Sequence, residues 1–383
     1  PASNGLFHKA ISQSGYTSSS TTIEAIGVDS EGKTINSLGS DSILNEYNAS
    51  SYQKIKNAYL TSPKRNADQY QRYLRSIDGK ELFAIYKSIA DKTFDRIPLA
   101  TRDGLVIPYE GIQAGLADPK NSKNIPVIAG SNKDELSLWL GANRYFVNAS
   151  FPLTKFVPIP KVEFKKPELY KLWVKTRSEG WKLRGVDEPL MALEKAGYKS
   201  LYSYRFDWDD QKKSFFADFP SLIGAAHGFE ISFITGDFKF GPIGRYVYPK
   251  GELRDQMQST MMSAWASFAR DGSPDTKKEV AWKKFNSLER PFIKLDKDES
   301  LAMDQGNLSI QNILENIKLS SVGTVIEKCL LAREVIENIG DPLESEYARW
   351  NQGVCNQFDV NFERKKIENQ LIAKYGSVSV YGD

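Results

Sequence analysis

Long hydrophobic runs are missing from this 383-residue chain, and histidine and cysteine are scarce. No apolar stretch approaches the roughly 18 residues that a membrane-spanning helix needs, so we expect no transmembrane segment. The chain also contains no GxGxxG, P-loop or HExxH pattern, which are the short motifs for dinucleotides, nucleotide phosphates and zinc. We therefore expect neither a cofactor nor a metal ion.

An excess of charge of one sign is also missing. Lysine and arginine total 51 against 48 for aspartate and glutamate, which leaves a net charge of +3. Such a small imbalance in a chain of this size does not favour nucleic acid as a partner. A hydrophobic content of 40%, with 12% aromatic residues, is typical of a globular protein with a sizeable core.

The two cysteines, Cys329 and Cys355, are too few for a cysteine-built zinc site or a disulfide-rich scaffold. They can pair with each other across a helical hairpin or remain as buried thiols, and their spacing does not decide between the two. A disulfide would favour a secreted or periplasmic location over the cytoplasm, because disulfides persist in oxidising compartments.

One of the only two histidines, His227, lies in the segment GAAHGFEISF at residues 224–233. Histidine is the side chain whose ordinary pKa suits proton transfer near neutral pH, so His227 is the first candidate for a catalytic base. Small residues around it allow close approach, and Phe229 and Phe233 supply apolar packing. The alternative is a structural histidine on a buried loop.

Hydrophobic patterning predicts an α/β protein. Residues 10–12 and 125–130 are short apolar runs typical of buried parallel strands, residues 200–208 alternate with one aromatic face, and residues 290–296 form one more strand. Helices are predicted from Ser40 or Asp41 as N-cap, across 82–89 and 187–196, and as a stripe from Met257 to Phe268. Residues 142–185, rich in proline, aromatics and lysine, are interpreted as an excursion that covers or lines the active-site cleft.

Polar residues follow two of these strands directly. Asp134 and Glu135 come after the strand at 125–130, and Ser14 follows the strand at 10–12. Ligand crevices of open α/β sheets lie at the carboxyl ends of the strands, so these positions favour chemistry. The alternatives are a helix cap or salt bridge for Glu135 and an ordinary turn for Ser14.

The order of these motifs resembles one family. The segments NIPVIAGSNKDELSLW, SLYSYRFDW, GAAHGFEISFITG and MMSAWASFARDGSPDT, in that sequence, are similar to the type-B carboxylesterases, the α/β-hydrolase family that includes the cholinesterases. The opening PASNGLFHKAISQSG resembles the segment that follows the nucleophile elbow in that family. The resemblance implies an α/β-hydrolase fold, with a mostly parallel central sheet flanked by helices and residues 1–383 forming the C-terminal portion of one domain.

The resemblance also implies roles for four residues. Glu135 corresponds to the acid of a catalytic triad and His227 to its base, in the chain order nucleophile, acid, histidine that the α/β-hydrolases follow. Ser14 and Glu230, in QSG and HGFE, match positions that lie behind the histidine as a buried polar pair.

The third triad member is not found. The family's serine lies in a GxSxG turn, and no such pattern occurs in this sequence. We therefore expect the nucleophile, the glycine-rich oxyanion loop and the N-terminal strands to lie upstream of Pro1, so that this chain needs the N-terminal remainder of the same esterase for activity.

Taken together, the sequence predicts a serine carboxylesterase that hydrolyses small-molecule or lipid esters through an acyl-enzyme. The alternative is an esterase-like protein without catalysis, which uses the fold for adhesion or binding, or an inactive truncated fragment. A third interpretation takes Asp134, Glu135 and His227 as metal ligands, but no HxH or ExxH spacing supports it.

Overall fold

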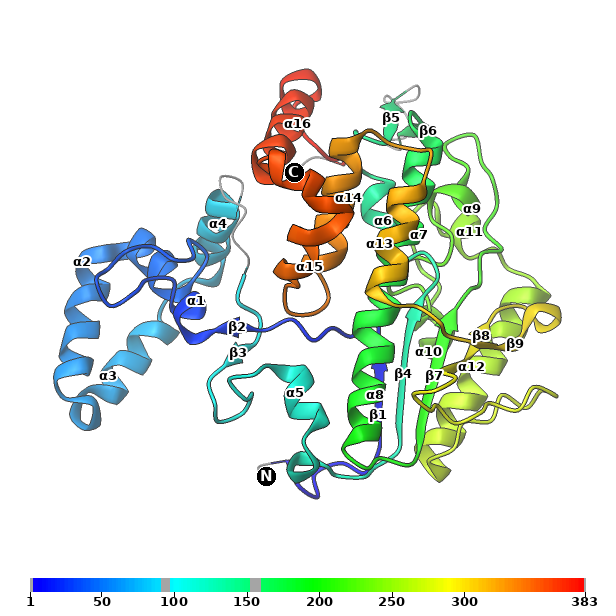
Figure 1. Ribbon diagram of the computed structural model, residues 1–383, viewed down its shortest axis with the longest axis horizontal. Helices are drawn as coiled ribbons and strands as arrows, with labels where there is room; N and C mark the ends of the chain where they lie inside the picture. The colour runs from blue at the N-terminus through cyan, green and yellow to red at the C-terminus, as the bar shows by residue number, and fades with distance from the viewer. Residues whose placement is uncertain (1–2, 91–96, 152–159, 382–383) are drawn as a thin grey trace. The chain divides into compact units, whose positions relative to one another are not determined.

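The computed structural model describes residues 3–90, 97–151 and 160–381 (Figure 1). The chain forms two compact units, one made of residues 1–17 and 113–383 and the other of residues 18–112. Among the described residues, no helix combines the length and the apolar character that a bilayer crossing requires.

The larger unit is built on a five-stranded sheet in the order β1-β4-β7-β8-β9. The first four of these strands run parallel, and β9 pairs with β8 in the antiparallel direction. This arrangement confirms the predicted, mostly parallel sheet. Its strands are β1 (Ala10–Gln13), β4 (Val127–Asn132), β7 (Leu201–Phe206), β8 (Pro291–Leu295) and β9 (Ala302–Gln305).

Helices cover both faces of the sheet, as the near-continuous apolar character of its central strands requires. Val127, Ala129 and Leu201 belong to a buried cluster with residues of α8 (Glu188–Lys195). The alternate residues of the same strands belong to the main core, together with the buried side of α12 (Glu252–Asp271). The predicted stripe on α12 is confirmed, because Met257, Met261, Trp265 and Phe268 are all buried.

Close packing between β4 and β7 depends on Gly130 of β4. This residue pairs with Tyr204 of β7, and a Cβ atom at position 130 would come within 2.1 Å of the Tyr204 ring. The absence of a side chain therefore lets the fully buried ring of Tyr204 lie across β4.

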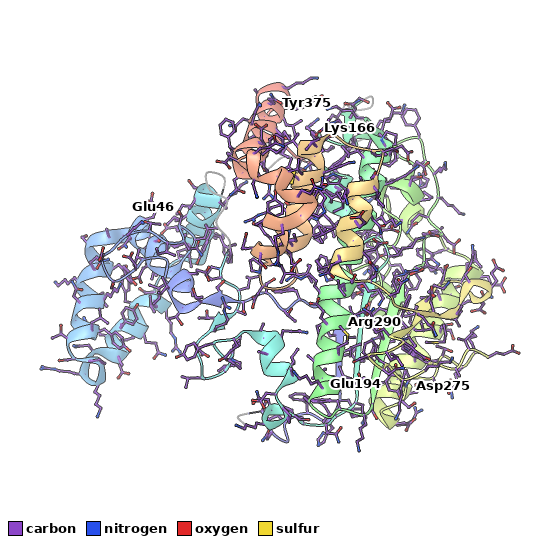
Figure 2. The ribbon with its side chains drawn as sticks, viewed as in Figure 1. Glu46, Lys166, Glu194, Asp275, Arg290 and Tyr375 are labelled. Carbon is purple, nitrogen blue, oxygen red and sulfur yellow. A yellow bond between two sulfur atoms is a disulfide. The ribbon has the colours of Figure 1, made fainter. Side chains whose placement is uncertain are left out.

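The structure describes residues 142–151 and 160–185 of the predicted excursion at 142–185. Strands β5 (Val147–Ser150) and β6 (Lys161–Phe164) form an antiparallel pair, and α7 (Pro167–Lys182) follows. Lys166 is labelled in Figure 2 and lies just before α7. Its Nζ is 2.8 Å from Glu327 Oε1 and 3.8 Å from the centre of the Tyr145 ring. Residues 152–159 of this excursion lie outside the described part of the chain.

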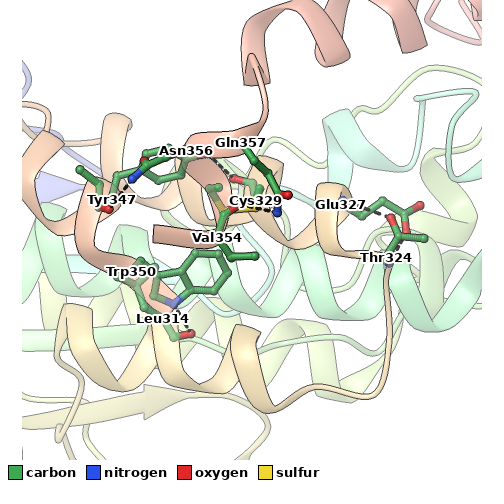
Figure 3. The surroundings of a disulfide bond; sticks show 11 residues. Leu314, Thr324, Glu327, Cys329, Tyr347, Trp350, Val354, Asn356 and Gln357 are labelled. Atoms are coloured by element: carbon green, nitrogen blue, oxygen red, sulfur yellow. Dashed lines mark hydrogen bonds between the residues drawn. A yellow bond between two sulfur atoms is a disulfide. The ribbon is translucent and has the colours of Figure 1, made fainter. Parts of the chain in front are cut away.

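The C-terminal helices form a second core cluster, around Ile313, Leu331 and Trp350. Within it Cys329 and Cys355 form a disulfide with a Cα–Cα distance of 5.6 Å, so the two residues are paired and not free thiols (Figure 3). The helix that carries Cys329 begins with a capping box between Thr324 and Glu327. The helices of this part are α13 (Ile310–Leu319), α14 (Val325–Glu337), α15 (Glu344–Arg349), η4 (Trp350–Gln357) and α16 (Val360–Tyr375).

Short elements complete the larger unit and connect its strands. They are α5 (Ile112–Ala117), η1 (Pro119–Asn121), α6 (Ser137–Leu140), η2 (Leu183–Asp187), α9 (Phe219–Leu222), α10 (Ile231–Thr235), α11 (Gly244–Val247) and η3 (Asp298–Ser300).

The smaller unit is mainly helical. Inside it, the buried carboxylate of Asp41 accepts hydrogen bonds from Tyr52 and Lys56. One sequence prediction is wrong here, because the N-cap of α2 is Gly39, without a side-chain cap, and not Ser40 or Asp41. Its elements are β2 (Ser20–Thr21), α1 (Thr22–Ile26), α2 (Ser40–Thr61), α3 (Pro63–Arg75), α4 (Gly79–Ala90) and β3 (Thr101–Arg102), with β2 parallel to β3.

Candidate active site

The candidate site lies where β1 and β4 end. Because the two strands are parallel, the residues that follow them meet at one edge of the sheet. Ser14 N donates to Gly130 O at 2.8 Å and continues the ladder by one residue. Ser14 itself has a φ of 52°, a left-handed conformation that is uncommon for serine.

Glu135 is fully buried in the turn after β4, and both of its carboxylate oxygens are engaged. Oε1 accepts hydrogen bonds from Ser14 Oγ at 2.6 Å and from the backbone N–H of Asn132 at 2.7 Å. Oε2 lies 2.7 Å from Nδ1 of His227. A buried carboxylate needs such donors, because an unsatisfied charge away from water costs several kcal/mol. The carboxylate is therefore held in one orientation.

His227 lies in the loop between α9 and α10, with a third of its side chain exposed. An ionised carboxylate only accepts hydrogen bonds, so the contact with Glu135 assigns the proton of the neutral ring to Nδ1. This tautomer leaves Nε2 as an acceptor, and none of the described residues bonds to it. The hydrogen bond to Glu135 raises the pKa of His227 above its ordinary value.

A second carboxylate, that of Glu230, lies near the Glu135–His227 pair. It is buried, and it accepts hydrogen bonds from Asn132 Nδ2 at 2.6 Å and from Gln13 Nε2 at 3.2 Å. Burial raises the pKa of Glu230 above the ordinary range of a glutamate. Asn132 thus joins the two carboxylates, since its backbone N–H bonds Glu135 and its side chain bonds Glu230.

Two tryptophans contact the imidazole ring. The centre of the His227 ring is 5.2 Å from that of Trp139 and 4.9 Å from that of Trp181. Trp181, on α7, also donates its Nε1–H to the carbonyl oxygens of Ser14 and Gly15. Both indoles border a cavity of about 310 Å³, whose lining is Leu136, Trp139, Arg177, Gly180, Trp181, Glu334, Val335, Asn338 and Ile339.

Asp134, the neighbour of Glu135, has no hydrogen bond to His227. Its carboxylate accepts instead from the backbone N–H of Ala225 at 3.1 Å, and burial raises its pKa to about 6. Within the described ranges, no group of three or more histidine, cysteine, aspartate and glutamate side chains is arranged to hold a metal ion.

The structure thus brings together the four residues that the sequence singles out, although Ser14 and Glu230 bond different partners and not one another. Sequence reasoning missed Asn132, Gln13, Trp139 and Trp181. The sequence did contain a signal for Asn132 and Gln13, because each is the last residue of a strand whose carboxyl end lies at the site. Trp181 had none, since it reaches the site from a helix 46 positions before His227.

Comparison with known proteins gives a consistent result. Residues 188–314 match the model of the carboxylesterase family. Acetylcholinesterase 1 of Caenorhabditis elegans is 24% identical, in an alignment that covers 96% of this chain and 61% of that protein. Human carboxylesterase 3 is also 24% identical, with 76% of this chain and 50% of that protein covered. The chain therefore spans between half and about three fifths of the length of these relatives.

Among solved structures, a carboxylesterase of Geobacillus stearothermophilus is similar to this chain with a TM-score of 0.42 and 19% identity. The match covers 62% of this chain and 49% of that one.

Proposed function

We propose, given that this chain belongs to the type-B carboxylesterase and cholinesterase-like family of α/β-hydrolases, that it carries the acid and the base of a serine carboxylesterase. Its family and relatives support hydrolysis of carboxylic esters in general. The observation that carries the finer proposal is the Glu135–His227 contact of 2.7 Å, with Glu135 fully buried and Nε2 of the ring unoccupied by any described residue.

In this proposal, His227 is the general base. Its Nε2 accepts the proton of a serine hydroxyl while the serine oxygen attacks the ester carbonyl carbon. The same proton passes from Nε2 to the leaving alcohol as the carbon–oxygen bond breaks, which leaves an acyl-serine. Water then attacks the acyl group by the same route and releases the acid. Glu135 accepts a hydrogen bond from Nδ1 throughout and stabilises the imidazolium that forms.

We propose that the serine belongs to a segment outside these 383 residues, as the absence of a GxSxG pattern suggests. The sheet is compatible with this arrangement. In the described part of the chain, β1 pairs with β4 alone, so its other edge can accept a further strand. Ser14 is not a candidate nucleophile, because its hydroxyl is buried and donates to Glu135.

Three neighbouring residues support the Glu135–His227 pair, namely Ser14, Glu230 and Asn132. Ser14 and the Asn132 N–H hold Glu135 Oε1, so that Oε2 faces the imidazole. The negative charge of Glu230 also raises the pKa of His227 and so favours the protonated imidazole. Trp139 and Trp181 limit the rotation of the ring, and the cavity beside them can hold one side of the ester.

The test is labelling of the full-length protein with a fluorophosphonate, which reacts with activated serines, followed by peptide mapping. We expect the label on a serine outside residues 1–383 and a strong decrease in labelling rate for His227→Gln. A label on a serine within these residues would overturn the assignment of the nucleophile. Failure to label, together with failure to hydrolyse esters, would favour the alternative of a binding protein without catalysis.

A further inference from the structure

The loop that carries His227 is held along its whole approach to the site. Each of the five backbone carbonyls from residue 222 to residue 226 accepts a hydrogen bond from a group distant in sequence. The donors, in order, are Tyr170 Oη, Ser137 Oγ, Gln211 Nε2, Asp134 N and Asn132 Nδ2. Three of these donors come from residues 132–137, the segment that also contains Glu135.

Asp134 differs from the other donors because it both donates a hydrogen bond to one loop residue, Ala225, and accepts one from it. Its backbone N–H donates to Ala225 O at 3.0 Å, and its side-chain Oδ2 accepts from Ala225 N at 3.1 Å. The adjacent Gly224 has a φ of +54°, and a Cβ atom there would lie 2.4 Å from Asp134 Oδ2. The loop therefore approaches the carboxylate too closely for any side chain at position 224.

The carboxylate of Asp134 forms no ion pair with any of the described residues, although the charge of Lys133 beside it partly offsets the rise in its pKa. The ammonium group of Lys133 bonds Asp209 at 2.9 Å. The N–H of Ala225 is the sole hydrogen-bond donor to this carboxylate in the part of the chain that is described. A carboxylate that is partly removed from water and forms no ion pair destabilises a fold. Its position here is therefore explained by what it binds, which is the backbone two residues before His227.

We propose that Asp134 is a positioning residue for His227, which fixes the loop so that the imidazole stays on Glu135. It acts through Ala225 and touches neither the imidazole nor the ester. The inference deepens the proposed function and rests on it for its catalytic consequence. Asp134 then holds the backbone of the histidine loop at Ala225, while Glu135 binds the ring of His227 and accepts from its backbone N–H at 3.3 Å.

The first test does not require catalysis. The imidazole of His227 can be titrated by NMR in full-length protein with labelled histidine, where its signal is identified as the one that is lost in His227→Gln. The second histidine of this chain, His8, is exposed. In Asp134→Ala, we expect the pKa of His227 to fall toward its ordinary value by roughly half a unit or more, as the Glu135 contact loosens. Asp134→Asn keeps an oxygen acceptor for Ala225 N and should retain most of the raised value.

The matched control is Asp209→Asn, which removes a nearby carboxylate that contacts Lys133 and not the loop. If it shifts the His227 titration as much as Asp134→Ala does, the effect is one of charge and the proposal fails. If Asp134→Ala does not fold, Asp134→Glu, which keeps the charge and displaces the acceptor by one methylene, takes its place under the same criteria.

The second test is kinetic. For ester hydrolysis by the full-length enzyme, we expect Asp134→Ala to lower kcat by about 10- to 100-fold, with KM changed little, because a small displacement of a reacting group is costly. Asp134→Asn should recover most of that loss. An Asp134→Ala variant with unchanged kcat and an unchanged His227 titration overturns the proposal. If the wild-type protein hydrolyses no ester, the proposed function fails, while the titration still decides whether Asp134 positions His227.

Discussion

Ser14 Oγ donates a hydrogen bond of 2.6 Å to Glu135 Oε1, although the two residues lie 121 positions apart in the chain. This bond joins the end of β1 to the turn after β4. With Asn132 N on the same oxygen, it determines which oxygen of Glu135 remains for His227. The acid of the proposed triad is thus oriented by the sheet itself, before any substrate binds.

The Ser14 hydroxyl can be tested by its removal. In Ser14→Ala, Glu135 Oε1 keeps one of its two donors, so we expect a loss of about 1–2 kcal/mol in the free energy of unfolding. We expect kcat to fall by about tenfold, because the carboxylate is held less firmly. Urea unfolding and steady-state hydrolysis measure the two effects. Ser12→Ala, on the same strand, is the matched control, and equal losses in both variants would contradict this role of Ser14.

The charge of Glu135 should control the imidazole. In Glu135→Gln, the main cause of the raised His227 pKa is lost, so the NMR titration midpoint should move downward. We expect kcat to fall on the order of 10³ to 10⁴, the scale found when a triad carboxylate becomes an amide. Glu163→Gln, at an exposed position on β6, should change neither quantity. A His227 titration that does not move would show that the acid is not Glu135.

The pH dependence of kcat/KM should follow His227. A base must be neutral to accept a proton, and the raised pKa keeps the ring protonated to higher pH than in a free histidine. Activity should therefore rise with pH through a midpoint above about 6.5. A pH profile of the full-length enzyme measures it. An acidic limb with its midpoint well below that value would be inconsistent with this assignment.

Asp134 should make stability depend on pH in a known direction. Burial raises its pKa to about 6, so the folded state favours the protonated form. The contribution of Asp134 to the free energy of unfolding is therefore largest at acidic pH, and it is lost as the pH rises from about 4 through 6. In Asp134→Asn that loss disappears, and we expect this variant to be more stable than wild type at pH 8 by about 1–2 kcal/mol. Chemical unfolding at pH 4 and pH 8 tests this, and a larger stability gain at pH 4 would contradict it.

The disulfide should stabilise the C-terminal helices. Cys329 and Cys355 are 26 positions apart, and a cross-link that closes a loop of this size contributes about 3 kcal/mol through the unfolded chain. Replacing both cysteines with serine should lower the free energy of unfolding by about that amount and leave ester hydrolysis intact. Loss of activity in a folded double variant would show that this region supports the site more directly.

Much of this arrangement could be predicted from the sequence, for physical reasons. The apolar run at 125–130 and the aromatic alternation at 200–208 predict the strands that the structure shows as β4 and β7. Parallel pairing of β1 with β4 then places Ser14 and Glu135 at the same edge of the sheet. The strand β9 was missed, because its four residues, AMDQ, show neither an apolar run nor an alternation. The contacts of Trp181 and Asp134 with the histidine region were also missed, since tertiary packing determines them and no local pattern encodes it.

The most direct measurement of the central claim is the ester-hydrolysis rate of the full-length protein with each of its two chain histidines replaced in turn. If His227 is the base, His227→Gln should lower kcat on the order of 10⁶, the scale found when a triad base is lost. His8→Gln, at an exposed position, should leave kcat unchanged. Equal activity in the two variants would contradict the account.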